Sequence, residues 1–275
     1  DTSTACRKIR MASRRIPLPN ERPEPATRSS RRLKLIVAYD GTDFAGWQSQ
    51  ANGETIQDRM EAAFAQVTGQ QVRVHGAGRT DAGVHAAGQC AHVDLPPSRL
   101  TPSVLADALN ASLPPTIRIM RCKVVPSTFH ARFDATGKVY RYRIATGRVL
   151  SPLELGRAWH VVRALDDEML RAAAATFVGR HDFAGFAANR GHPVNSTVRT
   201  IRRVRVQRSA GITVLEFDGN GFLYKMVRLM VGAIVRCALG QTTLPELRFR
   251  LDKTADEKAR LVAPAAGLTL VRVRY

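Results

Sequence analysis

The sequence is poor in cysteine and in aromatic residues, and it has no long apolar run. Its four cysteines stand at positions 6, 90, 122 and 237. None has CxxC spacing, so the pattern indicates neither a zinc ribbon nor a disulfide framework, and we expect a cytoplasmic protein. The most apolar stretch, Met226 to Leu239, contains Arg228 and Arg236. A spanning helix needs about 18 uncharged apolar residues, so we expect no membrane association.

Acidic residues are also scarce, because 23 Asp and Glu stand against 42 Lys and Arg among 275 residues, for a formal net charge of +19. An excess of this size makes a polyanion the first partner to consider, and nucleic acid the leading one. The hydrophobic content of 44% is that of a globular protein, so the chain can bury a conventional core. Composition therefore favours a folded protein that binds nucleic acid.

The chain divides into a tail and a patterned body. Residues 1–32 carry nine basic and three acidic side chains without apolar periodicity, which is typical of a solvated, disordered tail. From Leu33 onward, alternating and helical patterns predict an α+β protein with mainly antiparallel strands. We expect strands at 33–39, 72–75, 88–95, 117–125, 138–146, 198–208, 212–218 and 268–274. We expect helices at 55–67, 101–112, 166–178, 224–239 and 244–251.

A short internal sequence repeat suggests two similar halves. Asp43-Phe-Ala-Gly-Trp47 is repeated as Asp182-Phe-Ala-Gly-Phe186, and each copy stands at a similar place relative to the predicted elements. We therefore predict an N-terminal half at 33–147 and a C-terminal half at 148–275. A basic cleft between them would be a natural site.

Reactive polar groups are densest in the glycine-rich segment from His75 to Ala86. Arg79 and Asp81 lie two residues apart, so in an extended backbone they share a face, where the cation can hold the carboxylate ionised. The simpler alternative is a tight turn with an exposed Asp81. A metal site is a second alternative, with candidate ligands His75, Asp81, His85, His92 and Asp94, but none of the usual zinc spacings is present.

Two further stretches fit an RNA substrate. In 138–143, Tyr140 and Tyr142 face one side of a strand and Arg141 and Arg143 the other, which gives an aromatic platform beside cations. The alternative is that the tyrosines fill a core. Arg228 lies in an apolar helix and, if buried, needs a carboxylate, for which we assign Asp81.

The ordered motifs resemble those of the TruA family of tRNA pseudouridine synthases. They are Tyr39-Asp-Gly-Thr-Asp-Phe-Ala-Gly-Trp-Gln48, Gly78-Arg-Thr-Asp81-Ala-Gly-Val-His-Ala86, Ala131-Arg-Phe133, Lys138-Val-Tyr-Arg-Tyr142 and Gly221-Phe-Leu-Tyr-Lys-Met-Val-Arg228. The resemblance spans residues 33–275 and leaves only the tail outside.

This resemblance implies the pseudouridine synthase fold and a homodimeric, cofactor-free and metal-free isomerase. The enzyme would convert uridine to pseudouridine at positions 38, 39 and 40 of the tRNA anticodon stem-loop. It also implies that Asp81 is the catalytic nucleophile, attacking C1′ or C6, that Tyr140 stacks on the target base, that Arg228 pairs with Asp81 and that Arg79 holds the flipped nucleotide. The rival hypotheses are a basic RNA-binding protein without chemistry and a metal-dependent nuclease using His75, His85 and Asp81.

Overall fold

The computed structural model describes residues 30–51, 53–188, 196–252 and 261–275. Most of the predicted basic tail, residues 1–29, lies outside these described residues. The first strand begins at Arg31, two residues before the predicted start. Arg32 belongs to this strand because its guanidinium makes two hydrogen bonds to the carboxylate of Asp94, at 2.8 and 2.7 Å.

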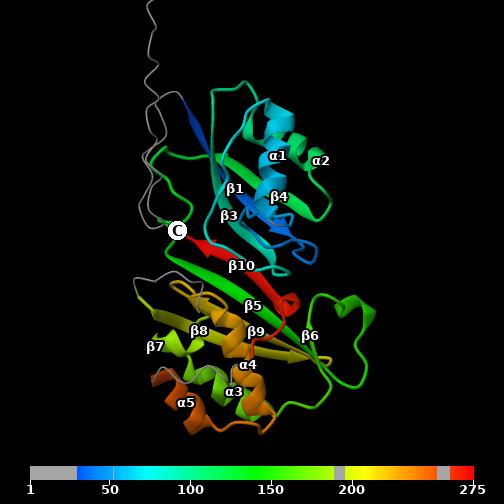
Figure 1. The fold of residues 1–275 in the computed structure, drawn as a ribbon, viewed down its shortest axis with the longest axis vertical. Helices are drawn as coiled ribbons and strands as arrows, with labels where there is room; N and C mark the ends of the chain where they lie inside the picture. Colours follow the sequence, from blue (N-terminus) through cyan, green and yellow to red (C-terminus); the bar gives the residue numbers. More distant parts are fainter. Residues whose placement is uncertain (1–29, 52, 189–195, 253–260) are drawn as a thin grey trace, which may run out of the picture.

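One mixed sheet runs through the described part of the chain (Figure 1). Its strand order is β4-β1-β3-β10-β5-β9-β8-β7, with β2 paired to β3 and β6 paired to β5. All neighbouring pairs are antiparallel except β10 with β3 and β5 with β6, so the α+β prediction with a mainly antiparallel sheet is confirmed. The strands are β1 (Arg31–Tyr39), β2 (His75–Gly76), β3 (His85–Leu95), β4 (Ile117–Val124), β5 (Gly137–Thr146), β6 (Trp159–Val161), β7 (Gly179–Asp182), β8 (Val198–Ser209), β9 (Ile212–Gly219) and β10 (Leu268–Arg274).

Two groups of helices flank the sheet (Figure 1). The helices α1 (Ile56–Thr68) and α2 (Pro102–Ser112) lie beside β1, β3 and β4, whereas α3 (Asp167–Thr176), α4 (Met226–Ala238) and α5 (Leu244–Asp252) lie beside β8 and β9. Local sequence explains three of the starts, because the side chains of Thr55, Thr101 and Asp166 cap α1, α2 and α3 by accepting a backbone N–H.

Besides β1, three predicted elements begin two or three residues from their predicted starts. The strand predicted at 72–75 is reduced to β2, because the N–H of Val74 is bound by the carboxylate of Glu61 and not by a strand partner. The strand predicted at 88–95 begins earlier, at His85. The helix predicted at 224–239 begins at Met226, because Lys225 adopts a left-handed conformation with φ 57°. The short strands β6 and β7 were not predicted.

The last strand, β10, lies in the middle of the sheet, between the group β4-β1-β3 and the group β5-β9-β8-β7. It pairs in parallel with β3 through Leu270 and Ala86, and antiparallel with β5 through Leu270 and Tyr140. Because β5 also pairs with β6 and β9, the sheet continues across residue 147, where we predicted the boundary between the halves. The C-terminal strand therefore joins β3 and β5, which lie more than 120 positions earlier in the chain, into one sheet.

Close backbone contact at β10 requires a glycine in β3. A Cβ atom placed on Gly88 would lie 2.6 Å from the carbonyl oxygen of Val271. Val271 sits at the register shift between Leu270 and Arg272, where β10 bends away from regular pairing. Any larger residue at position 88 must therefore displace β10.

We expect Gly88→Ala to lower the free energy of unfolding by about 1–3 kcal/mol, because the clash is with backbone and cannot be relieved by a rotamer change. Urea unfolding measures the change. Ala87→Val is the control, since Ala87 is the exposed neighbour in β3 and should change stability by no more than about 0.5 kcal/mol. Equal stability of Gly88→Ala and wild type would contradict this role of β10.

Candidate active site

The structure brings together the two charged residues that we paired from the sequence. Nη1 of Arg228 donates to Oδ2 of Asp81 at 3.2 Å. Their side chains are only 14% and 16% exposed. Arg228 is also fixed by its Nε, which donates to the carbonyl of Ala263 at 2.7 Å. The carboxylate is thus held beside a mostly buried guanidinium and stays reachable from solvent, an arrangement suited to a nucleophile or a base.

The loop that carries Asp81 is held by the segment that follows β1. Trp47 N–H donates to the carbonyl of Thr80 at 3.1 Å, and Gly83 N–H donates to that of Phe44 at 3.3 Å. The hydroxyls of Tyr39 and Thr80 lie 2.8 Å apart in a buried hydrogen bond. These contacts on both sides of residue 81 fix the backbone from which the carboxylate projects.

Gly46 makes this support possible. Its φ of +102° favours glycine, and a Cβ there would lie 2.6 Å from the Thr80 carbonyl oxygen. Tyr39 and Trp47 belong to the first sequence motif, but the motif predicts no role for them. Their hydrogen bonds to Thr80, which only the folded structure shows, indicate that they position Asp81.

The two tyrosines of β5 have different surroundings. Tyr142 is fully buried and its hydroxyl donates to the carbonyl of Pro264 at 2.8 Å, so the core alternative holds for this residue. Burial raises the pKa of Tyr142. Tyr140 is 7% exposed and packs edge to face against Phe222, with ring centroids 5.1 Å apart. Tyr140 is therefore the member of the predicted platform that lies nearest the surface.

The predicted cations of this region have different partners. On β5, Arg141 pairs with Glu216 at 3.2 Å and Arg143 pairs with Glu154 at 2.6 Å. Arg79 is exposed, one residue before the buried Thr80. The strand β8 contains five arginines and exposes Arg203 and Arg205 on one face. A basic surface therefore exists beside the sheet, although the arginines of β5 are engaged in ion pairs.

The candidate metal ligands make other contacts. Asp94 is bound by Arg32, and Nδ1 of His85 accepts the N–H of Gly41 at 3.1 Å. The other ring nitrogen of His85 faces the carbonyls of Gly156 and Ala266, at 3.0 and 3.1 Å. In the part of the chain that the structure describes, no group of three His, Cys, Asp or Glu side chains is arranged to hold a metal ion. The metal-dependent nuclease hypothesis has no geometric support among these residues.

Comparison with known proteins identifies the family. A profile of the family described as tRNA pseudouridine synthase matches residues 35–134 and 173–275, which include Asp81 and Arg228. The chain belongs to this family. The TruA-like resemblance read from the motifs is confirmed, and membership makes the chain an enzyme, an isomerase, in place of an RNA-binding protein without chemistry.

Several curated members of the tRNA pseudouridine synthase family are similar over most of their length. The protein named tRNA pseudouridine synthase A from Akkermansia muciniphila is 46% identical over 251 residues, covering 89% of this chain and 95% of that protein. The protein of the same name from Methylacidiphilum infernorum is 43% identical, covering 88% and 94%. A solved archaeal box H/ACA sRNP Nop10-Cbf5 complex matches with 9% identity and a TM-score of 0.31, over 87% of this chain and 46% of that one.

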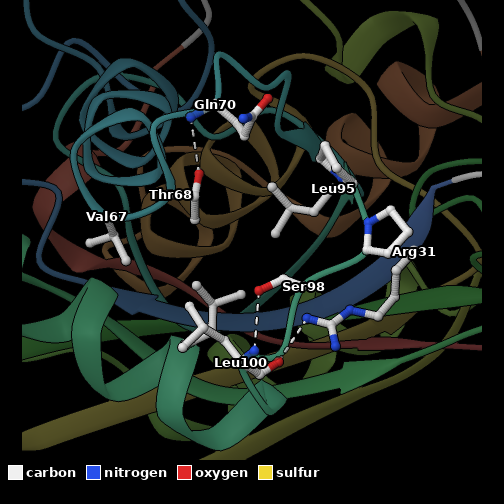
Figure 2. Close-up of a pocket in the computed structure, with 10 residues that line it drawn as sticks. Arg31, Val67, Thr68, Gln70, Leu95, Ser98 and Leu100 are labelled. Atoms are coloured by element: carbon white, nitrogen blue, oxygen red, sulfur yellow. Dashed lines mark hydrogen bonds between the residues drawn. The ribbon is translucent and has the colours of Figure 1, made fainter.

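One pocket of this family member lies apart from the ion pair of Asp81 and Arg228. Figure 2 shows this pocket, which is lined by Arg31, Val67, Leu95 and Leu100 among others. Leu95 is the last residue of β3, whereas the Asp81 loop precedes the first. The pocket contains none of the predicted site residues. Among the described residues, no helix has both the length and the apolar composition that crossing a membrane would need.

Three histidines of this synthase-family chain form a cluster between β2, β3 and the segment before β5, with His75 stacked on His92 and His130 packed edge to face against His92. The ring centroids of His92 lie 4.9 Å from those of His75 and 4.5 Å from those of His130. Nδ1 of His92 accepts the N–H of Ala131 at 3.2 Å, which requires an unprotonated nitrogen. Burial, followed by the charges of His75 and His130, lowers the pKa of His92 to about 2.

We expect this cluster to make the protein acid-sensitive. Below pH 6.5 the unfolded chain binds a proton at His92 and the folded chain does not, so stability is lost as pH falls. His92→Asn keeps a neutral acceptor near the Nδ1 position. Between about pH 6 and 4.5, unfolding free energies should fall by roughly 1.4 kcal/mol per pH unit more in wild type than in this variant. His160→Asn is the control and should follow wild type. Parallel profiles for wild type and His92→Asn would contradict the assignment.

Proposed function

We propose that this chain converts uridine to pseudouridine in tRNA, at positions 38, 39 and 40 of the anticodon stem-loop. The observation that carries the proposal is the Asp81 carboxylate held at 3.2 Å from Arg228, in a member of the tRNA pseudouridine synthase family. Relatives named tRNA pseudouridine synthase A support tRNA as the substrate. The motif resemblance supports the three positions. We further propose that the enzyme is a cytoplasmic homodimer without metal or cofactor.

In the proposed reaction Asp81 is the nucleophile. A carboxylate oxygen attacks C1′ of the ribose or C6 of the uracil. The bond from N1 to C1′ breaks, the base turns while it is enclosed, and a bond forms from C5 to C1′. The bond from the carboxylate oxygen to C1′ or C6 breaks in the same sequence, which returns Asp81 as a free carboxylate. The proton on C5 leaves and N1 gains one, so substrate and product are isomers. Arg228 donates a hydrogen bond to the carboxylate, and its second bond, to the carbonyl of Ala263, fixes the direction of the guanidinium.

The target uridine must leave the base stack before this attack. Extrusion costs roughly a few kcal/mol, which contacts to the base and phosphates offset. We assign stacking on the base to Tyr140 and contact with the flipped nucleotide to Arg79. Arg79 is exposed, and Tyr140, at 7%, is the more exposed of the two tyrosines of β5. The basic surface of β8 suits the phosphates that flank the base.

We expect Asp81→Asn to reduce turnover by at least about 1,000-fold and to leave tRNA affinity within about 3-fold, because the amide lacks nucleophilicity but keeps the shape. The assay is tritium release from tRNA labelled at C5 of uridine, since this hydrogen leaves when the new bond forms. Asp107→Asn, an exposed change on α2, is the matched control.

Retained turnover by Asp81→Asn would contradict the assignment of Asp81 as the nucleophile. Wild-type protein that binds tRNA without tritium release would instead favour RNA binding without chemistry. Circular dichroism melting of each variant separates loss of chemistry from loss of fold, because removing one partner of a mostly buried ion pair also destabilises the protein.

A further inference from the structure

Lys138 is a cation at the edge of the candidate active site. It precedes Tyr140 by two residues on β5, so the two side chains share a face of the strand, about 7 Å apart. Its ammonium reaches the glycine-rich loop, where a Cβ on Gly78 would overlap Nζ of Lys138. Among the residues that the structure describes, no carboxylate lies within ion-pairing distance of Lys138.

The charged groups that act on Lys138 are cations. Arg132 comes from the segment before β5, and Arg199 comes from β8. Burial, together with these two positive charges, lowers the pKa of Lys138 to about 8. We refer to Lys138, Arg132 and Arg199 as the Lys138 cluster.

Other cations at this end of the sheet do have an acidic partner. Asp218, which is buried, pairs with Arg202 at 3.5 Å and with Arg274 at 2.6 Å. Asp218 pairs across the sheet with Val139, so its carboxylate lies on the opposite face of β5 from Lys138, where it binds the two arginines. A desolvated ammonium beside like charges is unfavourable unless an anion from outside completes the site.

The Lys138 cluster borders the position proposed for the target base. Gly78, which Lys138 contacts, stands three residues before Asp81. Arg199 passes Gly221, where a Cβ would lie 3.6 Å from its Cδ, and the next residue, Phe222, packs on Tyr140. The cluster thus touches both the loop of the proposed nucleophile and the support of the proposed stacking residue.

We propose that the Lys138 cluster is a phosphate site that binds a backbone phosphate of the RNA beside the nucleotide held at Asp81. The inference rests on the proposed function for the position of that nucleotide. A phosphate supplies the missing anion, and an ammonium with two guanidinium groups is the donor set such a group takes. Lys138 is therefore a binding residue whose charge is kept at a cost in stability to the free protein.

The test is binding of a fluorescent anticodon stem-loop RNA to Lys138→Met and Lys138→Arg. We expect Lys138→Met to weaken binding about 10-fold and to reduce by about 1 the slope of log affinity against log salt. Lys138→Arg keeps the charge and should bind within about 3-fold of wild type. Lys123→Met is the control, because it removes an exposed ammonium from β4, at the edge of the sheet.

The pH dependence gives a second readout. Wild-type affinity should decrease between about pH 8 and 9.5 as Lys138 loses its proton, whereas Lys138→Arg should show a flat profile over this range. Gly78→Ala displaces the end of the Lys138 side chain and should weaken binding in the same direction as Lys138→Met. At pH 7, Lys138→Met should melt at or above the wild-type temperature, because it removes a desolvated charge.

The outcomes separate this site from the proposed reaction. If Lys138→Met binds RNA with wild-type affinity and salt slope, the phosphate site is wrong, even if wild type releases tritium from labelled tRNA. If Lys138→Met binds weakly and wild type releases no tritium, the phosphate site stands and the proposed reaction fails. Thermal melting shows whether Lys138→Met binds RNA weakly because it is unfolded. In that case the RNA affinities of Lys138→Arg and Gly78→Ala decide whether the phosphate site is right.

Discussion

The arrangement of the site depends on the insertion of β10 between β3 and β5. Leu270 pairs with Ala86 on one side and Tyr140 on the other. The loop with Asp81 leads directly into β3, so the proposed nucleophile and the proposed stacking residue are joined through one residue of the last strand. Arg228 is tied to the chain just before β10, because its backbone carbonyl accepts from Ala263 and its side chain donates back to Ala263.

Electrostatic pairing differs among the charged residues near this strand, and the differences suggest their roles. Asp81 has a partner that fixes it and leaves it reachable, as a reactive carboxylate requires. Asp218 joins two arginines and holds β5, β8, β9 and β10 together at one end. Among the described residues, Lys138 has no carboxylate partner, and we propose that its charge serves a ligand. In this strongly basic chain, the few carboxylates thus pair with arginines that hold the fold together, and other cations remain for binding RNA.

The sequence could predict the features that depend on local pattern or on chemical necessity. Caps and periodicity located α1, α2 and α3, and the rule that a buried arginine needs a carboxylate paired Arg228 with Asp81 across 147 positions. It could not predict that Tyr39 and Trp47 hold Thr80, or that Lys138 meets Gly78, because these contacts depend on strand order. Local pattern also failed at β2, where Glu61 takes the N–H of Val74 that a strand partner would bind.

The central claim is that uridine in the anticodon stem-loop is isomerised at Asp81. Incubation of an unmodified tRNA with wild-type protein in EDTA, followed by carbodiimide labelling and primer extension, tests it most directly. The account predicts reverse-transcription stops that report pseudouridine at positions 38, 39 and 40 with wild type and none with Asp81→Ala. Absence of stops with folded, tRNA-binding wild type, or equal stops with Asp81→Ala, would contradict it.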